Sequence, residues 1–167
     1  MKTEQYNRLI ADVRDTVYRL AIGILDDSSE AEDILQDVCE RVWRARDTVL
    51  DSKYPRAYVC RMARNLAIDR LRHRRFAVSS EVLHKDTGDD GDSTTSLSDM
   101  TTLTRKLMAQ LPEKQRLTME LRDVEGYEIE EIAAILESDD SSVRMNLSRA
   151  RKSIREQLIK AMNYGVS

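Results

Sequence analysis

Arginine, asparagine and serine side chains are interleaved with apolar residues through the segment 142–154. The apolar residues are Val143, Leu147, Ala150 and Ile154, and their spacing of three or four places them on one face of a helix. The polar residues therefore lie on the other faces. Arginine can donate two hydrogen bonds to a guanine edge and asparagine can bond an adenine edge, so this helix suits the major groove of DNA. A solvated basic helix at the end of a bundle is the alternative interpretation.

A short apolar helix is expected just before this basic helix, from about Glu128 to Leu136. Only a tight turn separates the two, which is the arrangement of a helix-turn-helix. In that motif the residues near the start of the second helix enter the groove. Asp139 or Asp140 can cap this start with a side-chain oxygen. The C-terminal part of the chain is therefore a candidate for binding duplex DNA.

A second polar group lies in the segment 56–75, which holds seven arginines and one acid and so has a net charge of +6. Tyr58 and Asn65 are interleaved with these arginines, and Arg61, Asn65 and Arg72 fall near one side of a helix. Charge, stacking and hydrogen bonding together suit a strand whose bases are unstacked. The alternative is an arginine-rich surface that contacts only solvent.

Seven acids and no base occupy the segment 26–40, which gives it a net charge of −7. Asp33 and Asp37 share a helical face with Glu40 and Trp43. Such a surface repels DNA but can bind a basic protein through charge pairs around an apolar anchor. A place for Trp43 in the core is the alternative.

Helices must position all of these groups, because apolar residues recur every three or four positions through most of the chain. Only 5 of the 167 residues are glycine and 2 are proline, so turn residues are scarce and the expected fold class is all-α. A capping-box spacing at Ser29 and Glu32 predicts where the second helix starts. Pro55 is expected to start the third helix and Gly126 to end the fifth. The apolar stretches that define the helices are 9–24, 34–42, 59–71, 97–107, 113–123, 128–136 and 143–158.

The segment 78–96 has no apolar period and is rich in Asp, Ser, Thr and Gly, which predicts a flexible acidic linker. It divides the chain into two small helical domains, 1–77 and 97–167. The net charge of −3, taken alone, argues against a nucleic-acid partner. That total is a sum of strongly basic and strongly acidic segments, so the objection does not hold.

The remaining motifs point away from catalysis and membranes. We find no signal peptide and no apolar run long enough to span a bilayer, so a cytoplasmic protein without membrane insertion is expected. Cys39 and Cys60 fit neither a CxxC nor a CxxCH pattern, and reduced thiols with no metal site are expected. A single Glu81-x-x-His84 in the linker is not the paired motif of a di-iron bundle, so no enzyme and no cofactor are expected. Two further classes of protein stay open: a stand-alone regulator that binds a palindromic operator as a dimer, and a scaffold that binds only protein.

Two ordered blocks of the sequence resemble the sigma-70 superfamily of bacterial RNA polymerase subunits. AEDILQDVCERVW followed by YPRAYVCRMARNLAIDRLR is similar to region 2 of that family. LPEKQRLTMELRDVEGYEIEEIAAIL followed by SSVRMNLSRARKSIREQL is similar to region 4. Their order, spacing and short length resemble the extracytoplasmic-function group, which keeps only these two regions. The resemblance implies a transcription initiation factor that binds core RNA polymerase and promoter DNA and performs no covalent chemistry.

The resemblance also implies roles for individual residues. Region 2 would dock on the clamp helices of the polymerase through Asp33, Ile34, Gln36, Asp37 and Trp43. It would bind the melted −10 element through Tyr58, Arg61, Arg64, Asn65, Asp69, Arg70 and Arg72, helped by the preceding loop 46–54. Region 4 would bind the −35 duplex through Ser142, Arg144, Met145, Asn146, Ser148, Arg149 and Arg151. The polymerase flap is a further part of the core enzyme that the chain would contact. An anti-sigma protein is a further partner that the resemblance leaves open.

The chain departs from the family pattern at three places. The turn 137–139 has the sequence ESD and lacks the usual glycine. Tyr127 and Glu128 stand where the family commonly has a Ser or Thr helix cap, and Asn146 replaces a frequent basic residue. The first two departures concern helix ends, and the third concerns which −35 sequence is preferred.

The expected linker limits how far the two domains can separate. About 20 residues span roughly 25 Å when relaxed and roughly 65–70 Å when stretched. Two DNA elements that lie two duplex turns apart are separated by roughly 70 Å. The linker alone would seldom hold both domains in register, so we expect the polymerase to set their spacing and the free protein to bind promoters weakly.

Overall fold

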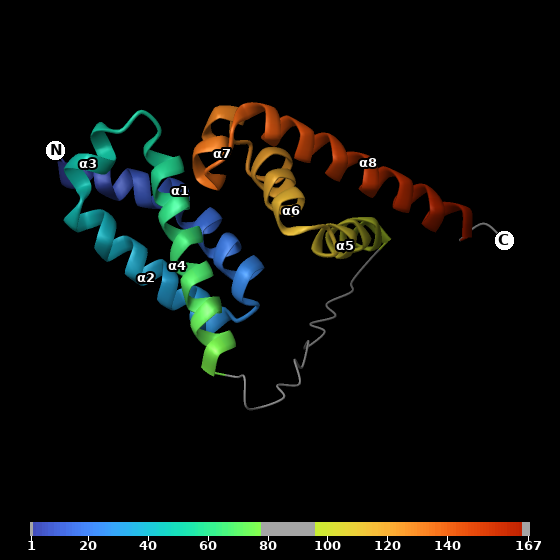
Figure 1. Ribbon diagram of the computed structural model, residues 1–167, viewed down its shortest axis with the longest axis horizontal. Coiled ribbons are helices and arrows are strands. Elements are labelled where there is room, and N and C mark those ends of the chain that lie inside the picture. The colour runs from blue at the N-terminus through green and yellow to red at the C-terminus, as the bar shows by residue number, and fades with distance from the viewer. Residues whose placement is uncertain (1, 78–95, 165–167) are drawn as a thin grey trace.

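The computed structural model describes residues 2–77 and 96–164, and within those ranges every regular element is a helix (Figure 1). The all-α prediction is confirmed. The predicted linker 78–96 lies outside the described residues except for its last residue, which begins a helix. The elements are α1 (Lys2–Leu25), α2 (Ser28–Arg44), α3 (Arg46–Asp51), α4 (Pro55–Ala77), α5 (Ser96–Ala109), α6 (Glu113–Met119), the π-helical turn η1 (Glu120–Val124), α7 (Ile129–Leu136) and α8 (Asp140–Tyr164).

Helices α1 to α4 form the N-terminal half, in which α1 packs against both α2 and α4. Each of these three long helices contributes the apolar stripe that its sequence spacing predicts. Val17 of α1, Val38 of α2 and Val59 of α4 are all completely buried. Val49 of the short helix α3 is buried in the same core. Most charged residues of these helices are left on the outside, which is where the candidate binding surfaces lie.

Two local predictions for the N-terminal half were wrong. The cap of α2 is Asp27, whose carboxylate accepts the Glu30 backbone N–H at 3.0 Å, and not Ser29. The reason is that Asp26 adopts a left-handed conformation with φ 52°, so the chain turns into the helix two residues earlier than the capping-box spacing suggests. The segment 46–54, expected to be a loop, begins with helix α3, which burial of Val49 holds in place.

Helices α5 to α8 form the C-terminal half, and α8 packs against α5, α6 and α7. Gly126, with φ 79°, ends the α6–η1 stretch as expected. The glycine-free turn before α8 is made by Glu137, which itself adopts φ 52°. Asp139 then caps α8 by accepting the Ser142 backbone N–H at 2.7 Å, so the predicted cap is confirmed.

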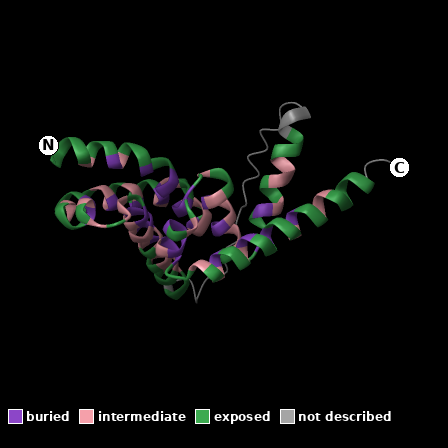
Figure 2. Cartoon of the chain, turned by 90° about the horizontal axis from the view of Figure 1, so that it is seen from above, coloured by how far each residue is buried: buried purple, intermediate pink, exposed green. Residues whose placement is uncertain are grey.

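The two halves share one apolar cluster. Leu20 of α1 and Cys60 of α4 pack in the same group of buried residues as Tyr127 and Ile132 from the C-terminal half. Helix α7 lies against α4 in Figure 1, and Figure 2 shows buried positions continuing across this junction, whereas the far ends of α5 and α8 diverge. In this structure the halves therefore form a single packed body.

Ile34→Ala should lower the free energy of unfolding by about 2–4 kcal/mol, because it removes a buried side chain and leaves a cavity in the core. Ile34 is 1% exposed. Urea unfolding followed by far-UV circular dichroism measures the change. Gln36→Ala, on the exposed side of the same helix, is the matched control and should change stability by less than about 0.5 kcal/mol. Equal small effects in the two variants would contradict the packing of Ile34.

Candidate nucleic-acid and polymerase interfaces

The outer face of α8 carries the residues expected to bind duplex DNA. Val143, Leu147 and Ala150 are buried against the rest of the C-terminal half, so the residues between them point outward. Arg144, Met145, Ser148 and Arg149 are exposed, and Ser142 and Asn146 are half-buried. The first turns of α8 therefore present an open surface with basic, amide and hydroxyl groups, as a recognition helix requires.

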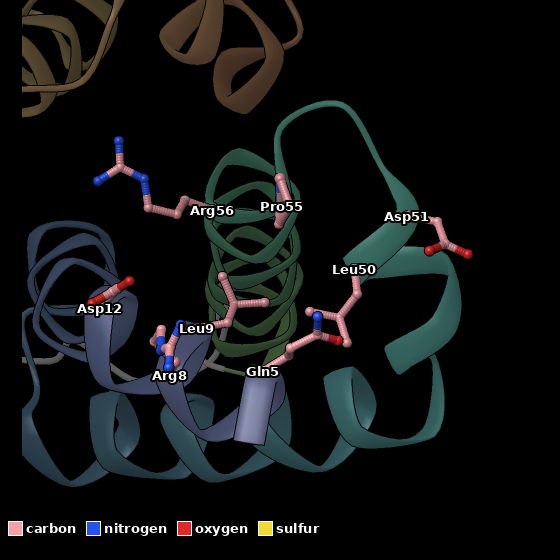
Figure 3. Close-up of a pocket in the computed structure, with 8 residues that line it drawn as sticks. All are labelled: Gln5, Arg8, Leu9, Asp12, Leu50, Asp51, Pro55 and Arg56. Carbon is pink, nitrogen blue, oxygen red and sulfur yellow. The ribbon is translucent and has the colours of Figure 1, made fainter. Parts of the chain in front are cut away.

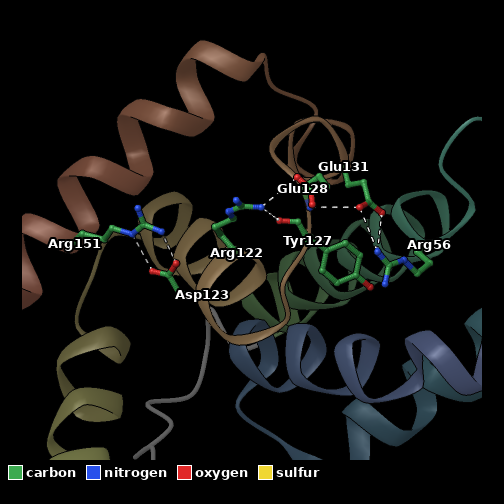
Figure 4. Close-up of polar contacts among 7 residues, drawn as sticks. All are labelled: Arg56, Arg122, Asp123, Tyr127, Glu128, Glu131 and Arg151. Atoms are coloured by element: carbon green, nitrogen blue, oxygen red, sulfur yellow. Dashed lines mark hydrogen bonds and ion pairs between the residues drawn. The ribbon is translucent and has the colours of Figure 1, made fainter.

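Arg151 differs from the other residues of this set. Its Nε and Nη2 atoms donate to the two carboxylate oxygens of Asp123 at 3.1 and 2.5 Å (Figure 4). This two-point contact joins α8 to the π-turn, and the hydrogen bond to Asp123 raises the pKa of Arg151. In this structure the Arg151 side chain therefore holds α8 against the π-turn and does not point freely outward.

Helix α4 presents the residues expected to bind the melted strand. Asn65, Asp69 and Arg72 are exposed along it, and its half-buried candidate residues are Tyr58, Arg61, Arg64 and Arg70. The Arg61 guanidinium lies 5.2 Å from the centroid of the Tyr58 ring, so an aromatic face and a cation are held side by side. Such a pair can stack on an unpaired base and bind its phosphate.

Helix α2 carries the candidate polymerase surface. Asp33 and Gln36 are exposed, and Asp37 is half-buried beside Arg41, whose Nε donates to its carboxylate at 3.0 Å. Trp43 is 39% exposed, so its alternative place in the core is ruled out. Its ring meets Tyr6 edge-on with centroids 5.0 Å apart, and the Arg46 guanidinium lies 4.2 Å from its centroid.

One residue that was predicted to contact polymerase, Ile34, does not lie on the surface. Ile34 is 1% exposed and belongs to the core of the N-terminal half. A buried side chain cannot contact another protein without unfolding its surroundings, so its role is to hold α2 in place. The resemblance marked Ile34 by its position in the motif, whereas burial depends on which face of α2 meets α1 and α4.

The α2 and α4 surfaces adjoin each other. The Arg70 Nη1 atom of α4 lies 3.5 Å from the Asp33 carboxylate of α2, and both side chains stay accessible. A residue expected to bind DNA thus pairs with one expected to bind polymerase. A partner on either surface therefore changes the electrostatic surroundings of the other.

A shallow pocket of about 340 Å³ lies where α1, α3 and the start of α4 meet (Figure 3). The residues that line it include Arg8 and Arg56, and the acids Asp12 and Asp51. Gln5, Leu9, Leu50 and Pro55 complete the lining. The pocket is lined by residues of both charge signs and lies beside the end of α4 that precedes Tyr58.

The thiols and acids give no sign of a metal centre in the described part of the chain. No group of three or more His, Cys, Asp or Glu residues within 2–77 and 96–164 is placed to hold a metal ion. Cys39 and Cys60 are both free thiols, and burial raises the pKa of Cys60 to about 12. Cys60 therefore stays protonated at neutral pH. None of the described helices is long and apolar enough to cross a membrane.

The residues that join the two halves were not predicted from the sequence. Thr16 Oγ1 donates to Glu125 at 2.9 Å, and Arg19 pairs with the same carboxylate. Arg56 Nη2 lies 3.2 Å from a carboxylate oxygen of Glu131 (Figure 4). No periodic signal marks these residues, because each contact joins positions far apart in the chain.

Comparison with known proteins identifies both halves. The family model described as Sigma-70 region 2 matches residues 9–77, and the one described as Sigma-70, region 4 matches residues 102–154. RNA polymerase sigma-E factor of Streptomyces avermitilis is 30% identical over 155 residues, which cover 92% of this chain and 85% of that protein. ECF RNA polymerase sigma factor SigW of Bacillus subtilis is 28% identical, over 89% of this chain and 87% of that protein.

A longer relative and a solved structure are also similar to this chain. The probable RNA polymerase sigma factor RfaY of Xanthomonas campestris is 28% identical, and this chain spans 41% of its length. The sigma factor RpoE, solved in complex with the anti-sigma factor NepR from Bartonella quintana, has the same fold with a TM-score of 0.71 at 21% identity over 93% of this chain and 97% of that one. These matches cover both helical halves in order, and the chain belongs to the sigma-70 family, in its extracytoplasmic-function group, whose members are transcription initiation factors that direct RNA polymerase to promoters.

Proposed function

We propose that the chain docks on core RNA polymerase through α2, binds the −35 duplex through the start of α8, and captures the melted −10 strand on α4. The observation that carries this assignment is that all three surfaces are accessible in the same structure. The acidic face of α2, the arginine-bearing face of α4 and the outer face of α8 all stay accessible while their apolar sides are buried. The contact set for polymerase is Asp33, Gln36, Asp37 and Trp43.

The work of this factor is differential binding, and it forms or breaks no covalent bond. Arginines on α4 and α8 attract the phosphate backbone, which supplies affinity but no sequence preference. Asn65 on α4 and Asn146 on α8 are amides that can accept and donate hydrogen bonds at base edges. Bases held by α4 after strand separation make the open promoter more favourable on the polymerase than the closed one.

We further infer the organisation and setting of the protein from the same assignment. Residues 1–77 and 97–167 act as two modules joined by the segment 78–96, and the protein works in the cytoplasm, where polymerase and promoter DNA are found. RpoE was solved with the anti-sigma factor NepR, and CnrH with the cytosolic domain of CnrY. A protein of the anti-sigma class is therefore a candidate regulator of this chain.

The decisive experiment adds the purified chain to bacterial core polymerase together with a library of promoter fragments. Selective transcription from a subset of fragments that share −35 and −10 sequences is the expected result. The chain without polymerase should bind the same fragments weakly. Tight, specific promoter binding by the isolated chain, particularly as a dimer on palindromic sites, would instead support a stand-alone regulator.

Asp37→Arg should weaken binding to core polymerase by about tenfold or more, because it places a like charge on the surface that meets a basic partner. Binding is measured by fluorescence anisotropy of the labelled factor with core enzyme. Glu4→Arg, the same charge reversal on an exposed residue of α1, is the matched control and should bind normally. Equal loss in the two variants would show that net charge, and not the α2 surface, governs the interaction.

Asn65→Ala should reduce transcription by about tenfold, which corresponds to about 1.4 kcal/mol, because the open complex loses a base-edge hydrogen bond. Polymerase binding should be unchanged. Permanganate footprinting of promoter melting, beside the polymerase-binding assay, separates the two effects. Asn7→Ala, which removes an exposed amide from α1, serves as the control. A parallel loss of polymerase binding in Asn65→Ala would contradict the role of α4.

A further inference from the structure

Asp123 of the π-turn belongs to none of the proposed binding surfaces, yet it holds Arg151, one of the residues expected to bind the −35 duplex. The Asp123 Oδ2 atom accepts from Arg151 Nε at 3.1 Å, and Oδ1 accepts from Nη2 at 2.5 Å (Figure 4). A two-point contact of this kind fixes the plane of the guanidinium as well as its position. The direction in which Arg151 presents its remaining N–H groups is therefore set by Asp123.

The Arg151 guanidinium has a second edge that Asp123 does not use. A guanidinium carries five N–H groups in one plane, and Asp123 accepts from the Nε–H and from one N–H of Nη2. The other N–H of Nη2 and the two of Nη1 make up the second edge. Figure 4 shows the third guanidinium nitrogen pointing away from Asp123, and the Arg151 side chain is 46% exposed. Two parallel N–H groups on one accessible edge match two oxygens of a phosphate.

The π-helical turn η1 places Asp123 opposite α8. The Glu125 N–H donates to the Glu120 carbonyl at 2.9 Å, so the turn between them is wider than an α-helical turn. Leu121 is 1% exposed and anchors the turn in the core. Wide turns of this kind are rare and occur frequently at functional sites. Asp123 is therefore carried by a fixed segment of backbone and not by a free loop.

Arg151 lies where the proposed DNA complex brings a backbone phosphate. Arg144, Ser148 and Arg151 are spaced by four and three residues, so they share one side of α8, and all three are exposed. Arg151 is roughly 10 Å along the helix from Arg144 at about 1.5 Å per residue. The major groove is about 12 Å wide. With Arg144 inside the groove, Arg151 therefore reaches its edge, where the phosphates lie.

We propose that Asp123 is a positioning residue for −35 binding, which turns the second edge of Arg151 toward a phosphate of the duplex. This inference rests on the proposed function. A phosphate contact carries no sequence information, and it fixes the register of α8 in the groove while other side chains read the bases. The ion pair also neutralises the Asp123 carboxylate, which would otherwise repel the phosphates. An acid thus favours DNA binding, which is the opposite of what its charge alone predicts.

The test measures how the salt concentration changes promoter binding by the chain assembled with core polymerase. Asp123→Ala, Arg151→Ala and the double variant are compared with the parent chain on a promoter fragment selected from the library. Fluorescence anisotropy gives the affinity between about 50 and about 200 mM salt. Asp123→Asn, which keeps the side-chain volume, is a milder second variant. Glu130→Ala removes an exposed acid of α7 and is the matched control.

Asp123→Ala and Arg151→Ala should each weaken promoter binding by about tenfold, because each loses the same charge-assisted contact to a phosphate. Each should also reduce the slope of log affinity against log salt concentration by about one. The double variant should lose no more than either single variant, since Asp123 acts through Arg151. Asp123→Asn should show a smaller loss in the same direction. Glu130→Ala should bind at least as tightly as the parent, and affinity for core polymerase alone should be unchanged throughout.

Parent-like or tighter promoter binding by both Asp123→Ala and Asp123→Asn would overturn the proposal, because Arg151 would then bind DNA without its partner. Additive losses in the double variant would overturn it as well, since the two residues would act independently. Weaker binding with an unchanged salt slope would show that the pair only holds α8 in place. A parent chain that selects no promoter would overturn the proposed function, whereas the salt slopes of the same variants on duplex DNA of unrelated sequence still judge the phosphate contact.

Discussion

The burial of Tyr127 is the interaction on which the arrangement of the whole chain depends. Its ring fills the cluster that Leu20 and Cys60 share with α7, and its hydroxyl lies against the Cys60 thiol. Burial raises the pKa of both groups, so each stays neutral and adds no uncompensated charge to the junction. Without this residue the ion pairs around it would be left on an exposed surface, where such pairs contribute little.

Charge is used in three different ways by one molecule. Arginines of α2 pair with acids of the same helix, as Arg41 does with Asp37, so the surface proposed to bind polymerase keeps only part of its negative charge. The acids near α7 pair with arginines of the other half. Arg144 and Arg149 on the outer face of α8 are exposed, and in the proposed function they contact phosphates. A net charge of −3 is the small remainder of these opposed surfaces, which is why it says nothing about DNA binding.

Predictions from local sequence patterns were correct where the structure depends on contacts within a single helix. The spacing of Val143, Leu147 and Ala150 predicted which face of α8 is buried, and Asp139, one of the two predicted caps, is the cap that forms. Predictions failed where neighbouring residues compete for the same role, and where the resemblance and not the apolar spacing assigned a residue. Asp27 displaced Ser29 as the cap of α2 because the left-handed Asp26 redirects the chain. Ile34 was assigned to a surface, although the packing of α2 against α1 and α4 buries it.

The sequence by itself determined the helices, their buried faces, and the basic and acidic surfaces, because these depend on residue spacing within one turn or a few turns of a helix. Only the tertiary structure decided that Glu125 and Glu131 meet Arg19 and Arg56, and that Cys60 is sealed by Tyr127. These partners lie 67 to 106 positions apart in the chain. Contacts over such separations follow from how whole helices pack, and no local period records them.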